Sequence, residues 1–117
     1  MLRLRAIAFA AISTLTLLVA TPGSAHATVG TFTYSYVDSA GNTLRDRLED
    51  PKSNVCHNIE QADDPDAEKP AHSPYNRTDD KAYVYAEPDC EGTEYVLAKE
   101  VGEGGAGMEF RSVIFMS

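Results

Sequence analysis

Residues 31–37 alternate hydroxyl and aromatic side chains in the order Thr-Phe-Thr-Tyr-Ser-Tyr-Val. Successive side chains of an extended chain point to opposite faces, so this period of two predicts a β-strand with one buried face. Further apolar or aromatic runs of strand length follow at 82–86, 93–97 and 110–115, and no segment after residue 27 indicates a helix longer than a turn or two. Short strands separated by turns predict an all-β sandwich or barrel.

The segments between these strands carry weaker signals. Residues 43–48 predict an exposed strand and residues 55–59 a short one, with turns at 38–42 and 50–54 and a tight corner at 88–92. Residues 60–80 hold three prolines and no apolar periodicity, so we expect a long loop, in which Asn76 and Thr78 of a glycosylation sequon help to turn the chain. Four glycines predict a flexible connection before the last strand: Gly102, Gly104, Gly105 and Gly107.

One spacing occurs twice. Tyr34 and Gly41 are as far apart as Tyr85 and Gly92, at an offset of 51 residues. This echo favours two similar β units, each with glycine at a corner where the backbone needs a positive φ.

The first 27 residues have the composition of a secretory signal peptide. Arg3 and Arg5 precede an apolar run over residues 6–20 that has no acidic residue, and Ala25 and Ala27 supply the small side chains that signal peptidase requires. The run is shorter than the roughly 20 apolar residues of a membrane-spanning helix. We therefore expect cleavage after Ala27 and secretion of residues 28–117 as a single domain, with no membrane contact in the mature form.

The mature domain is strongly acidic. Cleavage would remove two of the ten Lys and Arg residues and none of the eighteen Asp and Glu residues, which leaves a formal net charge of −10. Nucleic-acid binding requires clustered Lys and Arg, and here the basic residues are scattered among carboxylates. We expect a soluble monomer that binds no nucleic acid.

Cys56 and Cys90 are the two cysteines of the mature domain. An even count in an exported chain favours a disulfide, and a bridge over this separation would stabilise a small domain by about 3–4 kcal/mol on the loop-entropy model. Two free thiols or a metal pair are the alternatives. A zinc site is disfavoured, because His57 lies beside Cys56 whereas His72 falls in the expected loop.

The sequence YAEPDCEGTEY at 85–95, followed by FRSVIF at 110–115, resembles the Greek-key motif of the βγ-crystallin superfamily. Tyr85 stands at the opening aromatic, Gly92 at the corner glycine and Ser112 at the serine that closes the fold. The wider pattern resembles small secreted actinobacterial proteins of this superfamily, including killer-toxin-like proteins, over about residues 71–117. The resemblance implies a small Greek-key sandwich in which a disulfide at Cys90 takes the place of the motif's second aromatic.

No metal or cofactor is expected. Calcium-binding members of the superfamily place two acidic or amide residues, two variable ones and a hydroxyl residue ahead of the closing serine, and residues 107–111 lack this signature. Asp79 and Asp80 form an acidic pair without the hydroxyls that should follow. A further acidic cluster does not fit an EF-hand loop, because it contains prolines and lacks the glycine turn; a solvated loop fits better. It consists of Asp63, Asp64, Asp66 and Glu68.

Catalytic groups are equally sparse. The mature domain has two histidines and neither a nucleophile elbow nor a phosphate-binding loop. We predict a non-enzymatic secreted protein that binds an unknown protein or glycan, with the acidic cluster at 63–68 as its candidate binding loop. Two alternatives stay open. One is an inhibitor of extracellular proteases that presents loop 60–80, since a metalloproteinase inhibitor with this fold is known; the other is a hydrolase that uses a carboxylate pair.

Overall fold

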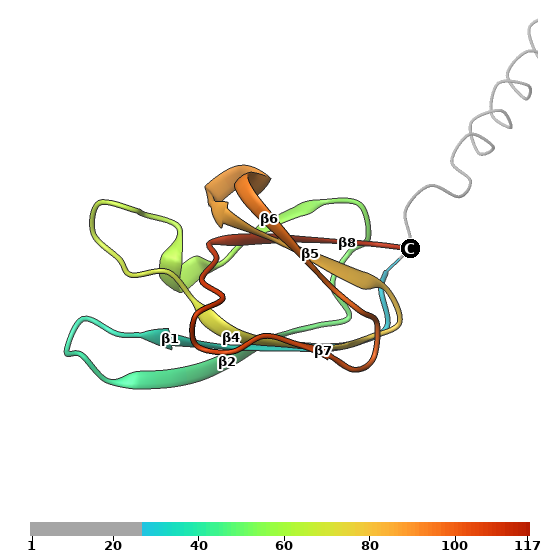
Figure 1. Ribbon diagram of the computed structural model, residues 1–117, viewed down its shortest axis with the longest axis horizontal. Coiled ribbons are helices and arrows are strands. Elements are labelled where there is room, and N and C mark those ends of the chain that lie inside the picture. Colours follow the sequence, from blue (N-terminus) through green and yellow to red (C-terminus); the bar gives the residue numbers. More distant parts are fainter. Residues whose placement is uncertain (1–26) are drawn as a thin grey trace, which may run out of the picture.

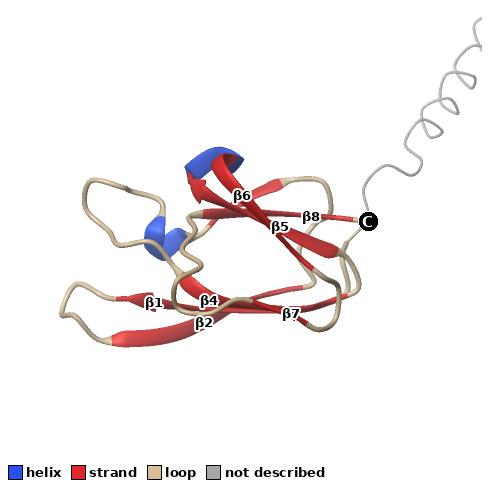
Figure 2. Ribbon diagram, in the orientation of Figure 1, coloured by secondary structure: helices blue, strands red, loops and turns tan. Residues whose placement is uncertain are grey.

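The computed structural model describes residues 27–117, which form two layers of β-sheet that face each other (Figures 1 and 2). Residues 1–26 of the expected signal peptide lie outside the described part. The strands are β1 (Gly30–Val37), β2 (Thr43–Glu49), β3 (Cys56–Asn58), β4 (His72–Thr78), β5 (Lys81–Glu87), β6 (Glu91–Leu97), β7 (Gly102–Glu103) and β8 (Ser112–Met116). Two short 3-10 segments complete the structure, η2 (Glu60–Ala62) and η3 (Pro88–Cys90). The predicted all-β class is confirmed.

Each half of the chain contributes one strand to the sheet that the other half mainly forms. The first sheet has the order β2-β1-β4-β7 and the second β3-β8-β5-β6, with antiparallel pairing throughout. Strand β7 from the second half of the chain therefore completes the first sheet, and β3 from the first half completes the second. The halves β1–β4 and β5–β8 have the same connectivity, and each is anchored in both sheets.

Aromatic and aliphatic side chains fill the space between the sheets. Phe32 of β1 meets Phe110 and Phe115 edge to face, with ring centroids 5.9 and 5.4 Å apart. Such pairs add about 0.5–1.5 kcal/mol to the burial itself. The aromatic face that predicted β1 thus points into the core, together with the other buried apolar residues: Tyr34, Ile59, Ala62, Ala71, Ala82, Val84, Leu97 and Val113.

The expectation of a continuous loop over residues 60–80 is wrong, because residues 72–78 form β4 inside the first sheet. The sequence of this strand shows no apolar alternation, but Pro74, Asn76 and Thr78 are its buried, inward-facing positions. Proline is tolerated because the pairing of β4 with β1 is irregular beside it, and a bulge requires no ladder N–H there. The expected loop position of His72 is also wrong, because His72 is the first residue of β4.

The glycine-rich segment also contains a strand. Gly102 and Glu103 form β7, which pairs with β4 at the edge of the first sheet. A Cβ atom on Gly102 would lie 2.4 Å from the backbone nitrogen of Ala98, so glycine permits a close approach that other residues would block. Strand β8 is shorter at its start than the predicted 110–115, because Phe110 forms an isolated bridge with Ala71 instead.

Asn76 fastens the turn between β4 and β5. Its Nδ2 donates to the carbonyl oxygens of Asp80 at 2.8 Å and Ala98 at 3.0 Å. Its Oδ1 accepts from the backbone nitrogen and Oγ1 of Thr78 at 3.2 and 2.7 Å. These bonds agree with the expected role of Asn76 and Thr78 in turning the chain. Asn76 is fully buried, so the folded domain does not present the sequon to a glycosylating enzyme.

Candidate functional site

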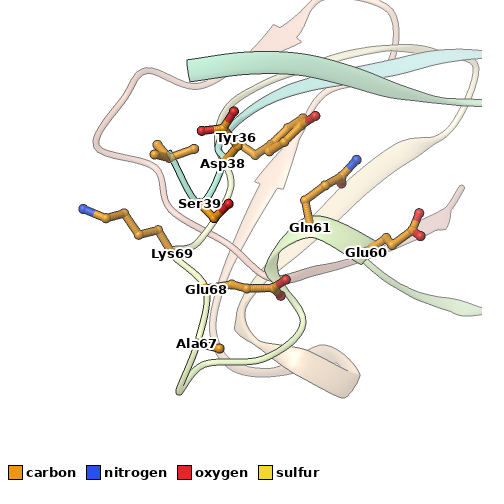
Figure 3. A pocket seen from close by; sticks show the side chains of 9 residues that line it. Tyr36, Asp38, Ser39, Glu60, Gln61, Ala67, Glu68 and Lys69 are labelled. Carbon is orange, nitrogen blue, oxygen red and sulfur yellow. The ribbon is translucent and has the colours of Figure 1, made fainter. Parts of the chain in front are cut away.

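A cleft of about 630 Å³ lies between the β1–β2 turn and the loop that begins at η2. Figure 3 shows Tyr36, Asp38 and Ser39 on one side of it and Glu60, Gln61 and Glu68 across from them. Val37, Ala67 and Lys69 complete the lining. Two segments that are more than 20 residues apart in sequence thus form one recess. The first follows β1 of the first sheet, and the second follows β3 of the second sheet.

The β1–β2 turn is held by the side chain of Asp38. Its Oδ1 accepts hydrogen bonds from the backbone nitrogens of Ala40 at 3.0 Å and Asn42 at 2.8 Å. Gly41 follows with φ +89°, a conformation that costs glycine no steric strain. The cleft wall is therefore a defined turn, and one carboxylate oxygen of Asp38 is committed to building it.

The facing loop is organised by its own acidic residues. The carbonyl of Asp64 accepts from the backbone nitrogens of Ala67 and Glu68 at 3.1 and 2.8 Å. Glu68 Oε1 in turn accepts from the backbone nitrogen of Asp64 at 3.2 Å, and Asp64 Oδ1 accepts from that of Asp66 at 3.0 Å. Of the four acidic residues predicted to form a binding loop, Glu68 lines the cleft, whereas Asp63, Asp64 and Asp66 are exposed outside it.

A chain of hydrogen bonds fixes Gln61 at the cleft wall. The hydroxyl of Tyr34 donates to Gln61 Oε1 at 2.9 Å, and Gln61 Nε2 donates to Asp46 Oδ2 at 2.7 Å. Burial of the phenol, followed by the nearby Asp46 carboxylate, raises the pKa of Tyr34 to about 12. Strands β1 and β2 thereby hold η2 in place. Gln61 carries no chemical signature that would have distinguished it in the sequence.

The lining supports recognition by polar contacts. Asp38, Glu60 and Glu68 contribute carboxylates, Lys69 one cation, and Gln61 an amide beside the ring of Tyr36. The nine lining residues include no His or Cys. Within residues 27–117, no group of three or more His, Cys, Asp and Glu side chains is arranged to hold a metal ion. No helix in this part of the chain combines the length and apolar character of a membrane span.

The predicted disulfide is confirmed and joins β3 to η3. Cys56 of β3 and Cys90 of η3 are bonded, with their Cα atoms 6.0 Å apart. Beside this bond, Asn58 and Asp89 exchange two hydrogen bonds, from Asn58 Nδ2 to Asp89 Oδ1 at 3.0 Å and from the Asp89 nitrogen to Asn58 Oδ1 at 2.7 Å. Strand β3 of the first half is therefore tied to the corner of the second half.

The three residues named for the Greek-key motif lie at this same corner. Ser112 Oγ donates to the carbonyl of Glu87 at 2.6 Å and accepts from the backbone nitrogen of Cys90 at 2.8 Å, and Ser112 is fully buried. Gly92 has φ +86°, and a Cβ on it would lie 2.9 Å from the Glu87 side chain. The Tyr85 hydroxyl donates to Glu94 Oε2 at 2.5 Å.

Comparison with protein-family models, with curated proteins and with solved structures found no match to this chain.

Proposed function

We propose that residues 1–27 direct export and are removed, and that residues 28–117 act outside the cell as a binding protein of the βγ-crystallin type, without catalytic turnover. Two observations support the family. Strand β4 lies beside β1 and β8 beside β5, as the fourth strand of a Greek key lies beside its first. Ser112 bridges both sides of the β5–β6 corner, as expected for the motif's closing serine.

The cleft between the β1–β2 turn and residues 60–69 is the proposed binding site. The proposal depends on one observation, that hydrogen bonds within both walls give the cleft a defined shape. Its walls are a capped turn and a self-bonded loop on a rigid β scaffold, which is how many binding proteins present their contact residues. Its volume is in the range of small-ligand pockets. A sugar ring or a short peptide segment of a protein partner fits this size and polarity.

Capture of partners by the secreted protein tests the proposal. We would apply the purified protein to a glycan array and use it in affinity pull-downs from the surroundings of the producing cell. Glu68→Gln keeps the acceptor that closes the loop but removes a cleft charge, and Lys69→Ala removes the cleft cation. Asp66→Asn is the matched control, because it removes one charge from the same loop outside the cleft.

We expect each cleft variant to weaken capture about tenfold or more, as for contacts worth 1.4 kcal/mol, and the control to bind like the wild type. Equal capture by all the proteins would contradict the cleft as the binding site. A protease panel run in parallel tests the inhibitor alternative, for which only the loop between η2 and β4, and not the whole of 60–80, is available to enter a protease cleft.

A further inference from the structure

Asp80 lies in a buried polar site at the turn between β4 and β5. Asp80 is only 7% exposed to solvent. Asp80 Oδ2 accepts hydrogen bonds from Thr28 Oγ1 at 2.8 Å and from Ser53 Oγ at 3.2 Å, and these two hydroxyl oxygens lie 2.8 Å apart. Thr28 is fully buried and Ser53 is 8% exposed, so three chain segments converge on one carboxylate.

The carboxylate lacks a cationic partner among the described residues. Residues 27–117 contain one ion pair, between Arg47 and Glu49 on β2, and none at Asp80. A buried carboxylate is costly unless it is both hydrogen-bonded and paired with a positive charge. Two neutral hydroxyls on Oδ2 satisfy part of its hydrogen-bonding capacity but leave its charge uncompensated.

We propose that Asp80 is the centre of a binding site for a primary ammonium group, and that its ligand is the α-ammonium of Thr28, formed when the signal peptide is removed. This inference rests on the proposed cleavage after Ala27. Hydrolysis of the Ala27–Thr28 peptide bond consumes one water, leaves a carboxylate on Ala27 and turns the Thr28 amide nitrogen into an ammonium. The chain's own new terminus supplies the missing charge.

The position of the Thr28 nitrogen suits this role. It donates to the carbonyl of Pro51 at 2.8 Å, which leaves the other protons of an ammonium free. The same residue already places its Oγ1 2.8 Å from Asp80 Oδ2. Processing therefore completes the site: the mature terminus is tied both to residues 51–53 and to the β4–β5 turn.

The test moves the ammonium by one residue without changing a side chain. The full precursor would be expressed in a secreting host, as wild type and with one glycine inserted between Ala27 and Thr28, and intact mass would identify the first residue of each secreted protein. We expect the wild type to begin at Thr28. The inserted glycine should lower the melting temperature by about 5–10 °C, because the ammonium leaves the site.

Combination with Asp80→Asn makes the test specific. In that background the inserted glycine should change the melting temperature by only about 1 °C, since the charge that it separates is already gone. Asp79→Asn is the control: it removes a neighbouring, exposed carboxylate and keeps an acceptor for the Val29 nitrogen, so the effect of the insertion should persist in full.

A second readout does not depend on the stability of the Asp80 variant. The α-amine of the wild type should react with an amine-selective ester at neutral pH about tenfold more slowly than that of the glycine-inserted protein, because the ion pair holds it. A first residue other than Thr28 would overturn the inference by removing its ligand. If both proteins are cleaved after Ala27, equal melting temperatures and equal labelling rates for the wild type and the glycine-inserted protein would overturn the inference. An effect of the insertion that is unchanged in the Asp80→Asn background would overturn it as well.

Discussion

The β1–β2 turn and the β5–β6 corner occupy matching places in the two halves of the chain, but they are held in different ways. Each follows the first strand of its half and contains a glycine with φ near +90°, Gly41 at +89° and Gly92 at +86°. The first turn is closed by Asp38 through bonds within residues 38–42. The second is fastened from outside, by Ser112 of β8 and by the Cys56–Cys90 disulfide to β3.

On the proposed function, this difference separates the region that stabilises the fold from the region that binds a partner. The β5–β6 corner brings together bonds from both halves of the chain, so its loss should affect the whole domain. The β1–β2 turn has only local bonds and borders the cleft, so its loss should affect the stability of the domain less. The two tyrosines of the repeated spacing also differ, because Tyr34 is buried in the core, whereas Tyr85 is part-exposed and bonded to Glu94.

Removal of the disulfide should produce the largest effect. The double variant Cys56→Ala/Cys90→Ala releases a loop with a sequence separation of 34, and we expect it to lower the free energy of unfolding by about 3–4 kcal/mol. Urea denaturation measures this loss, and the wild type in excess reductant should show the same midpoint shift. A change below about 1 kcal/mol would mean that the corner is held by its hydrogen bonds without the covalent link.

The second effect concerns Ser112 of β8. Ser112→Ala removes the acceptor for the Cys90 nitrogen and the donor to the Glu87 carbonyl, so we expect a loss of about 1–3 kcal/mol in unfolding free energy. Ser39→Ala at the open turn is the matched control, because Ser39 is exposed and its loss should cost less than about 0.5 kcal/mol. Equal midpoints for the two variants would remove the distinction between the corners.

Much of the fold could be predicted from local pattern, and β4 shows where such prediction stops. Alternating aromatic and hydroxyl residues identified β1, and apolar runs identified β5 and β6. The inward positions of β4 hold Pro74, Asn76 and Thr78, which carry no apolar signal. Asn76 is satisfied by carbonyls of the β4–β5 turn and of Ala98, partners that exist only after the sheets have formed.

The candidate site was predictable to a smaller extent. Its two walls were each expected as a turn or loop, and Glu68 was named as a binding residue. Tyr36, Asp38 and Gln61 were not, because their proximity arises from the packing of η2 against β1 and β2. A sequence pattern reports which residues are exposed in a loop, but not which two loops face each other.

The open turn should show a smaller stability effect than the corner and a clear effect on binding. Asp38→Ala removes the acceptor for the nitrogens of Ala40 and Asn42 at an exposed site, and we expect a loss of about 0.5–1 kcal/mol in unfolding free energy. Capture of a partner by the Asp38→Ala variant should also decrease, because the cleft wall becomes less ordered. Asp38→Asn keeps the acceptor and should restore most of the stability. Full binding by Asp38→Ala would show that the turn is not part of the site.

The smallest effect is a difference in the titration of the two tyrosines. The pKa of each is raised to about 12, but for Tyr34 the main cause is burial, and for Tyr85 it is the hydrogen bond to Glu94. We expect Glu94→Gln to lower the pKa of Tyr85 clearly, whereas Asp46→Asn should lower that of Tyr34 only in part, because the phenol stays buried. Ultraviolet absorbance of tyrosinate, with Tyr34→Phe and Tyr85→Phe to assign the transitions, measures both values.

The same shifts set the direction of the stability change with pH. A tyrosine whose pKa is about 12 in the folded state and about 10 in the unfolded state keeps its proton more firmly when the protein is folded. Its contribution to the free energy of unfolding is therefore complete below pH 10 and is lost as the pH rises towards 12. Stability should therefore decline over this interval. The decline should be shallower in Tyr34→Phe than in the wild type, because phenylalanine does not titrate. If Glu94→Gln lowered the pKa of both tyrosines equally, the two corners would be electrostatically coupled, and the separation drawn between them would fail.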